Sequence, residues 1–264
     1  MMKRIIFSLV VMLFCKVGIS QNAATEMFQL ASPKMNVSAV FFDSFTTLEI
    51  TKDLPNSVIK YSLDGSEVNQ DSKVYNEPLK IAESAVIRAI VYHPDYLESD
   101  EVQLEVVKTV KESAIKSLVL NPQPSEKYSG LGATGLMDLK KGSAQFGGDK
   151  QWLGYQTDSV LATLQLEKNS EVSKVVLSAL TNQSNWIFAP GKIEVFYDGE
   201  IIGTETYSNS KIEASNSATF LTVPVVKGAY KTLDVVIYSL SEIPEWHQGK
   251  GTTPWLFIDE IIIQ

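Results

Sequence analysis

The sequence is poor in the side chains that most often carry metal, redox and nucleophilic chemistry. Its 264 residues include one cysteine and two histidines. Cys15 lies in an apolar segment near the N-terminus, so the rest of the chain has no thiol for a disulfide, a nucleophile or a zinc site. His93 and His247 fall in different predicted domains, which argues against a two-histidine metal site. A calcium site remains possible, because calcium binds oxygen ligands.

Basic residues are also in the minority. The chain has 23 Lys and Arg against 31 Asp and Glu, which gives a formal net charge of −8. Nucleic acids and anionic membrane surfaces are bound by clustered basic side chains that neutralise phosphate groups. The charge balance therefore argues against both kinds of partner.

The apolar run at the N-terminus is too short to cross a membrane as a helix. Residues 5–15 give about 11 apolar positions, whereas a spanning helix needs about 20. Lys3 and Arg4 precede the run, and small residues follow it up to Ser20. This order is typical of a secretory signal peptide. We therefore predict a signal peptide over residues 1–20, no membrane span, and export to the periplasm, the cell surface or the medium.

Catalytic motifs are scarce as well. Residues 130–135 match Gly-x-Gly-x-x-Gly, but Pro122 and Pro124 interrupt the approach, where a dinucleotide site needs a strand. We interpret the segment as a glycine-rich loop. The chain has no Gly-x-Ser-x-Gly elbow, and two small domains offer little scaffold for the carboxylate pair of a glycosidase. We predict that the protein is not an enzyme, with a glycosidase left open as the exception.

The chain is rich in apolar and aromatic residues that favour strands. Hydrophobic residues make up 44% and aromatic residues 9% of the sequence. Strand-like runs bounded by turn residues occur at 39–42, 47–51, 58–62, 85–92 and 102–107, and then at 117–120, 162–166, 174–179, 192–197, 200–207, 218–223, 230–239 and 255–263. The first group fits an immunoglobulin-like sandwich and the second a jelly roll. We predict an all-β chain of two tandem β-sandwiches, with domains at 28–108 and 113–264.

The first domain resembles the chitobiase/β-hexosaminidase C-terminal domain. Residues 59–67, 74–79 and 84–91 match, in order, that family's Y-T-x-D-G-S-x-P, Y-x-x-P-[IL] and T-x-[IL]-[KR]-A blocks. Val68 stands where the family usually has proline. The resemblance implies an immunoglobulin-like spacer that accompanies glycoside hydrolases and carries no catalytic residues.

The second domain resembles a discoidin, or coagulation-factor-5/8 C-terminal-type, domain of the kind appended to bacterial hexosaminidases. The family's L-x-D-G, W-x-G-[FY], W-I-x-x-P-x-x-[VI]-E-V and [FV]-D-E-I motifs correspond to residues 135–138, 151–155, 186–195 and 255–261, and residues 172–175 also match. Leu139 replaces the glycine of the opening motif. The resemblance implies a carbohydrate-binding module with a discoidin-like jelly-roll fold.

The same resemblance implies one structural calcium ion. In such modules the ion lies between the loop after the first strand and an acidic residue of the last strand, which here points to Asp138 and Glu260. Carbonyl or hydroxyl oxygens near Lys141, Gly142 and Ser143 could complete the ligand set. The alternative is that Asp138 caps a turn and Glu260 is a solvated strand residue.

Loop aromatic residues and neutral amides point to a glycan ligand. An aromatic face packs on the C–H face of a sugar, and amides exchange hydrogen bonds with hydroxyl and acetamido groups. The candidate ligand-binding residues are Trp246, His247, Asn182, Gln183, Asn185 and Trp152. Trp246 and His247 lie in a glycine-containing loop that could present an exposed platform, whereas Trp152 could instead pack at the start of a strand. Trp186 and Trp255 are predicted core residues.

These observations lead to two hypotheses. The first is an exported, non-catalytic carbohydrate-binding protein that holds an N-acetylhexosamine- or galactose-type glycan in loops of the C-terminal sandwich. The alternative is a structural or adhesion module that binds a protein partner, such as a separately encoded surface glycoside hydrolase. Fold alone does not decide between them.

Overall fold

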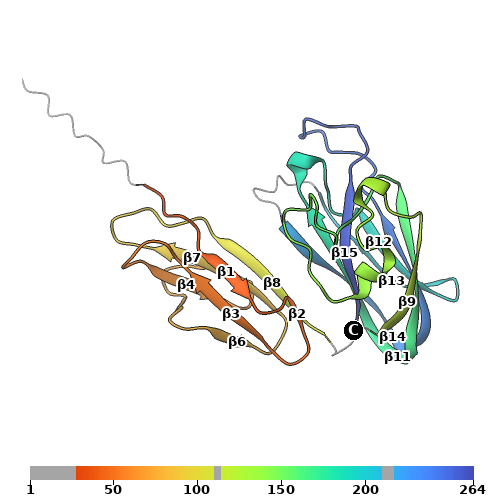
Figure 1. The fold of residues 1–264 in the computed structure, drawn as a ribbon, viewed down its shortest axis with the longest axis horizontal. Helices are drawn as coiled ribbons and strands as arrows, with labels where there is room; N and C mark the ends of the chain where they lie inside the picture. Colours follow the sequence, from red (N-terminus) through yellow and green to blue (C-terminus); the bar gives the residue numbers. More distant parts are fainter. Residues whose placement is uncertain (1–27, 110–113, 210–216) are drawn as a thin grey trace, which may run out of the picture.

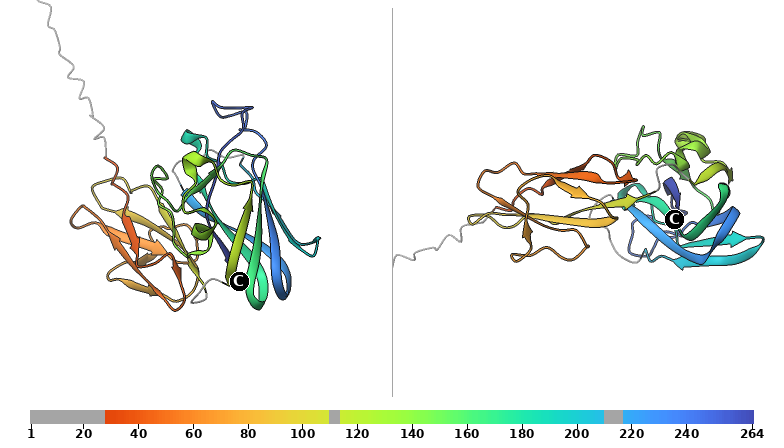
Figure 2. Two further views of the ribbon diagram at one scale, coloured as in Figure 1. Left: turned by 45° about the vertical axis from the view of Figure 1, so that its right-hand side comes forward. Right: turned by 90° about the horizontal axis from the view of Figure 1, so that it is seen from below.

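The computed structural model describes residues 28–109, 114–209 and 217–264. The predicted signal peptide, residues 1–20, lies outside this range. The described chain consists of β-strands and short 3-10 helices in two sandwich units, shown in orange to yellow and in green to blue in Figures 1 and 2. The predicted all-β fold class, with two tandem sandwiches, is confirmed.

The first unit packs a three-stranded sheet against a five-stranded sheet. The smaller sheet has the order β1 (Lys34–Val37), β3 (Thr46–Thr51), β6 (Leu79–Ile81), and the larger has the order β2 (Phe41–Phe42), β8 (Val102–Lys108), β7 (Ala85–Tyr92), β4 (Val58–Ser62), β5 (Lys73–Val74). Alternate side chains of the central strand β7, including Ile87, Ala89 and Val91, are buried against Leu48 and Ile50 of β3. This period of two is what one buried face of a strand requires.

The second unit is built around two long antiparallel strands. The strands are β9 (Ile115–Asn121), β10 (Leu153–Tyr155), β11 (Ser159–Thr181), β12 (Lys192–Tyr197), β13 (Glu200–Thr206), β14 (Ser217–Tyr238) and β15 (Leu256–Ile263). Their order is β10-β15-β11-β14-β12-β13, and β9 also pairs with β11. The first half of β11 pairs with β9 and its second half with β15, so this strand contributes to both ends of the sandwich.

The long strands correct one part of the prediction. The separate strands expected at 162–166 and 174–179 are both parts of β11, and those expected at 218–223 and 230–239 are parts of β14. Register shifts in β11 absorb the polar segment between the two expected strands. Pro224 and Gly228, which resemble turn residues in the sequence, pair with Lys174 and Val172 at these irregularities. Bulges and strand irregularities are where proline and glycine are tolerated in a sheet.

The two units meet at a small apolar cluster. Phe41 and Val107 of the first unit pack with Val176 and Ile262 of the second. The ring of Phe41 meets that of Phe220 edge-on, with 5.4 Å between centroids. No helix among the described residues is long and apolar enough to span a membrane.

Candidate functional site

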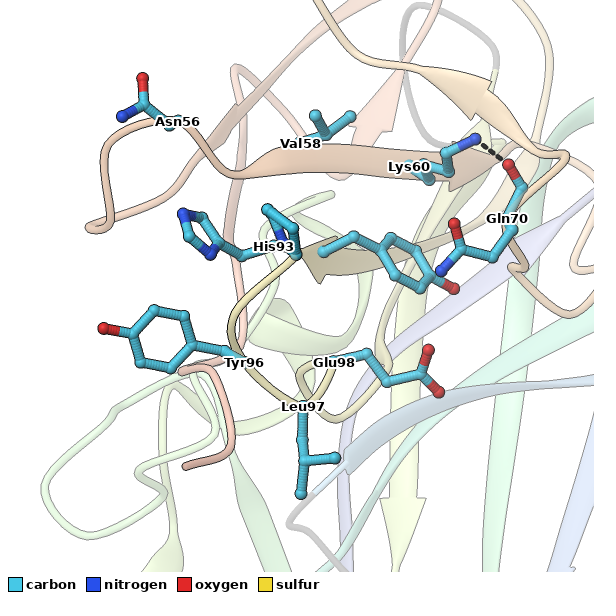
Figure 3. A pocket seen from close by; sticks show the side chains of 10 residues that line it. Asn56, Val58, Lys60, Gln70, His93, Tyr96, Leu97 and Glu98 are labelled. Atoms are coloured by element: carbon cyan, nitrogen blue, oxygen red, sulfur yellow. Dashed lines mark hydrogen bonds between the residues drawn. The ribbon is translucent and has the colours of Figure 1, made fainter. Parts of the chain in front are cut away.

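Two hollows of the described surface combine aromatic and polar side chains. One lies on the first unit beside β4 and β7 (Figure 3) and has a volume of about 560 Å³. The other, of about 500 Å³, lies at one end of the second unit and is lined by Gln156, Trp186, Thr252, Thr253 and Trp255. We call the second one the end hollow. It forms where the segment after β10, the 3-10 helix η3 (Gln183–Asn185) and the loop before β15 meet.

Trp186 forms one wall of the end hollow. It follows η3 in a left-handed conformation, with φ of 58°, and its N–H donates to the Gln183 carbonyl at 2.9 Å. This backbone region is uncommon for a bulky residue, so the surrounding contacts must hold it. A Cβ at Gly249 would overlap the Trp186 indole, so the loop can approach the ring only with glycine at this position. The Trp186 side chain remains 36% exposed.

Trp255 also lines the hollow. Its backbone N–H donates to the Trp186 carbonyl at 2.8 Å, and its own carbonyl accepts the N–H of Phe188 at 3.0 Å. The indole meets Tyr128 edge-on at 5.2 Å and is half-buried. Backbone hydrogen bonds therefore fix the spacing of the two tryptophans.

The polar groups of the end hollow are neutral. The Gln156 Nε2 donates to the Thr253 carbonyl at 3.2 Å, and the Thr252 hydroxyl donates to the Gly249 carbonyl at 2.7 Å. The Gln156 Oε1, the Thr253 hydroxyl and the acceptor pairs of Thr252 are left over for other partners. No charged side chain is among the five lining residues. Such a surface suits a ligand that offers apolar faces and hydroxyl groups.

His247 joins the loop before β15 to η3. Its Nε2 lies 2.9 Å from the Gln183 carbonyl oxygen, and its Nδ1 accepts the N–H of Gly249 at 3.0 Å. A carbonyl only accepts, so the proton must be on Nε2, and both ring nitrogens are satisfied in the neutral tautomer. The ring also meets Trp186 and Phe188 edge-on, each at 5.5 Å. His247 therefore positions the wall of the hollow and does not line it.

Three of the predicted ligand-binding side chains are buried, which corrects their expected role. The exposed fractions are 1% for Trp152, 3% for Asn182 and 8% for Gln183. The Trp152 indole N–H donates to the Ser143 carbonyl at 2.8 Å. The Asn182 Oδ1 accepts hydrogen bonds from Ser184 and Asn185, both at 2.9 Å, and so stabilises the turn of η3.

The remaining predicted residues, Trp246 and Asn185, lie next to the end hollow without lining it. Trp246 is half-buried against Phe188, with 6.2 Å between ring centroids, so it is not the exposed platform expected from the sequence. Asn185 is exposed. The loops singled out in the sequence border the end hollow, but the sequence analysis placed Trp186 and Trp255 in the core. Trp186 immediately follows the amide-rich turn, and that position was the available signal for its exposure.

The region of the expected calcium site contains a buried carboxyl group, that of Glu260. Glu260 of β15 is fully buried, and no side chain among the described residues donates a hydrogen bond to its carboxylate oxygens. Burial, together with the charges of Asp138 and Asp259, raises the pKa of Glu260 to about 9, although the backbone N–H groups of Leu139 and Lys140 act in the opposite direction. The alternative interpretation of Glu260 as a solvated strand residue is therefore wrong. A cation would satisfy this carboxylate, so Glu260 fits a metal ligand.

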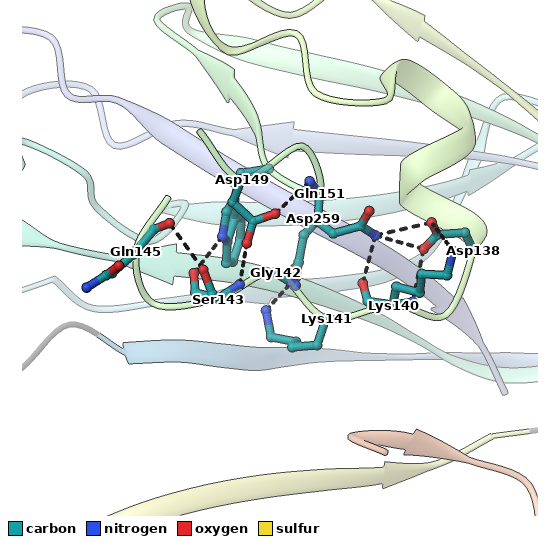
Figure 4. A network of polar contacts seen from close by, with 10 residues as sticks. Asp138, Lys140, Lys141, Gly142, Ser143, Gln145, Asp149, Gln151 and Asp259 are labelled. Carbon is teal, nitrogen blue, oxygen red and sulfur yellow. Dashed lines mark hydrogen bonds and ion pairs between the residues drawn. The ribbon is translucent and has the colours of Figure 1, made fainter. Parts of the chain in front are cut away.

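Asp138 directly follows the 3-10 helix η2 (Gly132–Met137) and lies in a polar network with the segment that leads to β10 (Figure 4). Its carboxylate accepts the Lys140 N–H at 2.9 Å and the Gln151 side-chain amide at 3.0 and 3.1 Å. These contacts match the turn-capping alternative for Asp138. The hydrogen bonds to Asp138 use lone pairs on both of its oxygens, but an ionised carboxylate has additional lone pairs that can bind a cation. Asp138 therefore still fits as a second ligand.

Lys141 and Ser143 contact other partners. The Lys141 Nζ lies 2.5 Å from the Asp259 Oδ2, which also accepts the Gly142 N–H at 2.6 Å. Burial raises the pKa of Asp259 and lowers that of Lys141. The Ser143 N–H donates to Asp149 at 2.7 Å. No cluster of three Asp, Glu, His or Cys side chains suited to a metal occurs in the described ranges. A metal here would need main-chain carbonyl oxygens in addition to Asp138 and Glu260.

Comparisons with known proteins give one family match and several distant structural likenesses. The family described as Fn3 associated matches residues 48–106, inside the first unit, where the sequence led us to expect a chitobiase/β-hexosaminidase C-terminal domain. No curated protein matches the sequence.

The solved structures with some likeness share little sequence with this chain. A SusE-like protein is 13% identical over 87% of this chain and 95% of its own, with a TM-score of 0.36. A pectin-binding carbohydrate-binding module is 16% identical over 58% and 91%, with a TM-score of 0.30. A two-domain protein of unknown function from Bacteroides fragilis is 8% identical over 89% and 93%, with a TM-score of 0.32.

Proposed function

We propose that this protein binds carbohydrate without catalysis and that the end hollow holds the glycan. The observation that carries the proposal is the pair of tryptophans, Trp186 and Trp255, that face one hollow together with an amide and two hydroxyl-bearing side chains. Indole faces pack on the C–H face of a pyranose, and a few placed polar groups fix its orientation. The hollow's lining includes no carboxylate, which a glycosidase needs in pairs.

The neutral lining favours a neutral sugar. Amide and hydroxyl groups can both donate and accept, as sugar hydroxyls and acetamido groups do. An N-acetylhexosamine- or galactose-type terminus is therefore the ligand class that we propose. Export through a signal peptide over residues 1–20 belongs to the same proposal, because a glycan-binding protein must reach its polysaccharide.

We also propose one calcium ion, held by Asp138 and Glu260 together with main-chain carbonyl oxygens. When bound, calcium would neutralise the buried Glu260 carboxylate and tie β15 to the segment that carries Asp138. The burial of the Glu260 carboxyl group, to which no side chain of the described residues donates, supports this assignment. The ion has a structural role in this proposal and does not contact the sugar.

A glycan array followed by isothermal titration tests the proposed function. The chain should bind at least one neutral glycan class, and Trp186→Ala should weaken that binding by about tenfold or more, since aromatic stacking adds to the loss of buried area. Val119→Ala, an exposed apolar truncation on β9 away from the hollow, is the matched control. If a folded chain binds no glycan, or if Trp186→Ala binds like the control, the proposal is wrong.

A further inference from the structure

The hollow on the first unit is lined by a second set of aromatic and polar side chains (Figure 3). It lies between β4, the loop before β5 and the loop after β7, and its volume is about 560 Å³. Asn56, Lys60, Gln70, Tyr92, Tyr96 and Glu98 are among the residues that line it. All of them belong to the first unit, so this hollow is separate from the end hollow.

Paired strands and a pinned loop form the walls of this hollow. Val58 of β4 pairs with Tyr92 of β7, which fixes one wall. Beyond β7 the loop turns back, and the Ser99 N–H donates to the Val91 carbonyl at 3.1 Å. The Leu97 N–H donates to the Phe28 carbonyl at 3.0 Å, which holds the loop from its outer side. The hollow is therefore largely preformed, as ligand sites usually are.

Large apolar side chains are exposed around the same hollow. Val58, Tyr96 and Leu97, which line it, are 39%, 36% and 50% exposed. Phe28, joined to Leu97 by the backbone hydrogen bond, is 75% exposed. A gathering of exposed apolar side chains on a monomer often marks a binding surface.

The polar side chains of the hollow have free hydrogen-bonding capacity. In the part of the chain that the structure describes, no hydrogen bond or ion pair engages the side chains of Asn56, Gln70 or Glu98. The Lys60 ammonium contacts the main-chain carbonyls of Gln70 and Ser72. Unlike the end hollow, this surface offers one ammonium group and one carboxylate in addition to amides.

The charges define the ligand class. One cation, Lys60, and one carboxylate, Glu98, face the same hollow, so an anion would meet the carboxylate and a cation would meet the ammonium group. A neutral ligand with many hydroxyl groups can accept from Lys60, donate to Glu98 and exchange both kinds of bond with the amides. Tyr92 and Tyr96 supply aromatic surface for the apolar side of a sugar ring.

We propose that the hollow on the first unit is a second glycan-binding site, selective for neutral oligosaccharides. Its assignment does not depend on the end hollow, because the two sites share no residue. With both sites present, the chain could engage one polysaccharide at two points, and binding to a long glycan would exceed binding to a disaccharide without any further contact.

Protein-observed ¹H–¹⁵N spectra of the chain, titrated separately with N-acetyllactosamine, cellobiose and mannobiose, test the second site. We expect at least one of these neutral probes to shift the side-chain amide signals of Asn56 and Gln70 and the backbone amides of residues 96–98. Trp186→Ala should leave these shifts in place, because Trp186 belongs to the other unit. This arm separates a failure of the end hollow from a failure of the second site.

Two variants and a control give the energetic test. Tyr96→Ala should weaken binding at this site by about tenfold. Gln70→Ala removes an exposed side chain without a partner, so it should fold normally and still weaken the binding. Phe45→Ala is the control, because Phe45 is an exposed aromatic residue of the same unit outside the hollow.

Three results would overturn the proposal. The first is that none of the three neutral disaccharides shifts the signals around residues 96–98. The second is that digalacturonate, an acidic probe, binds there more tightly than every neutral probe. The third is that Phe45→Ala weakens binding as much as Tyr96→Ala does.

Discussion

At the scale of single residues, the burial of Glu260 has an electrostatic consequence. Its carboxyl group is fully buried without a side-chain donor among the described residues, and its folded-state pKa of about 9 lies well above the ordinary value of 4.5. The folded chain therefore holds this proton more tightly than the unfolded chain does. A bound cation would remove the same penalty by pairing with the ionised form.

The first prediction concerns pH. A raised folded-state pKa gives a stabilising contribution that is complete below the unfolded-state pKa of 4.5 and is lost as the pH rises towards 9. In chelator, the free energy of unfolding should fall over this range by at most about 1.4 kcal/mol per pH unit. Glu260→Gln, which stays neutral, should flatten that part of the slope. Urea denaturation at several pH values measures both chains, and identical slopes would contradict the prediction.

The second prediction concerns calcium. Calcium should raise the melting temperature of the chain and a chelator should lower it, because the ion binds the folded state alone. Asp138→Asn and Glu260→Gln should both abolish the response. Asp158→Asn, at an exposed position outside the network, should respond as the unaltered chain does. Equal melting temperatures with calcium and with chelator would contradict the calcium proposal. They would not bear on the proposed glycan site.

At the scale of elements, the loop before β15 and the turn η3 act together. Trp186 lies on one and is held by His247 and Gly249 of the other. The position of the indole is therefore a property of the pair of loops. A change that does not touch the ligand can still disturb the hollow.

The third prediction tests this coupling. Gly249→Ala places a methyl group where the Trp186 indole lies, so the ring must move, and glycan affinity at the end hollow should fall by about tenfold. Gly147→Ala is the matched control, because a Cβ at Gly147 meets no atom within 4 Å. Isothermal titration compares the two variants, and circular dichroism checks their folding. Equal affinities would show that the ring tolerates the displacement.

The fourth prediction concerns His247, which connects the loop before β15 to η3. His247→Ala removes the contact with the Gln183 carbonyl and the packing against Trp186. We expect a loss of stability of about 1 kcal/mol. Weaker glycan binding should accompany it, although His247 does not line the hollow. Thermal unfolding and titration measure the two effects, and unchanged binding would mean that Trp186 is held by its backbone alone.

The same elements show how far the sequence could be interpreted. The strand at residues 85–92 and the two loops of the second unit follow from local patterns, because short apolar runs and the turn residues that bound them are local signals. The length of β11 does not follow from local patterns. The polar segment in its middle looks like a loop in the sequence, but register shifts keep it within one continuous strand. The burial of Glu260 could not be predicted either. The segment around Leu139 helps to bury Glu260, although it lies more than a hundred residues earlier in the sequence. Only the tertiary fold brings Leu139 and Glu260 together.

At the scale of the whole molecule, the contact between the two units includes a titratable group. Glu105 of β8 is partly buried near Phe220, and burial raises its pKa to about 7, while the Phe220 backbone N–H lowers it. The Gln264 side-chain amide donates to the Lys108 carbonyl at 2.5 Å beside the same contact. Ionisation of Glu105 therefore works against the docking of the units.

The fifth prediction follows from this position. The raised pKa gives a contribution to docking that is complete below 4.5 and is lost as the pH rises through about 7. Differential scanning calorimetry should show one cooperative transition at low pH and a partial separation of two transitions at mildly alkaline pH. Glu105→Gln should remove the difference, whereas Glu49→Gln, on the exposed side of β3, should keep it. One unchanged transition at every pH would refute this account.

The placement of the tryptophans has an optical consequence. Trp152, Trp186, Trp246 and Trp255 all belong to the second unit, whereas the first unit contains tyrosine and phenylalanine but no tryptophan. Indole emission therefore reports on one sandwich alone. Light absorbed by tyrosines of the first unit can reach an indole only by energy transfer from one unit to the other. The natural chain thus carries its own donor and acceptor groups, and the efficiency of that transfer records how closely the two sandwiches stay together.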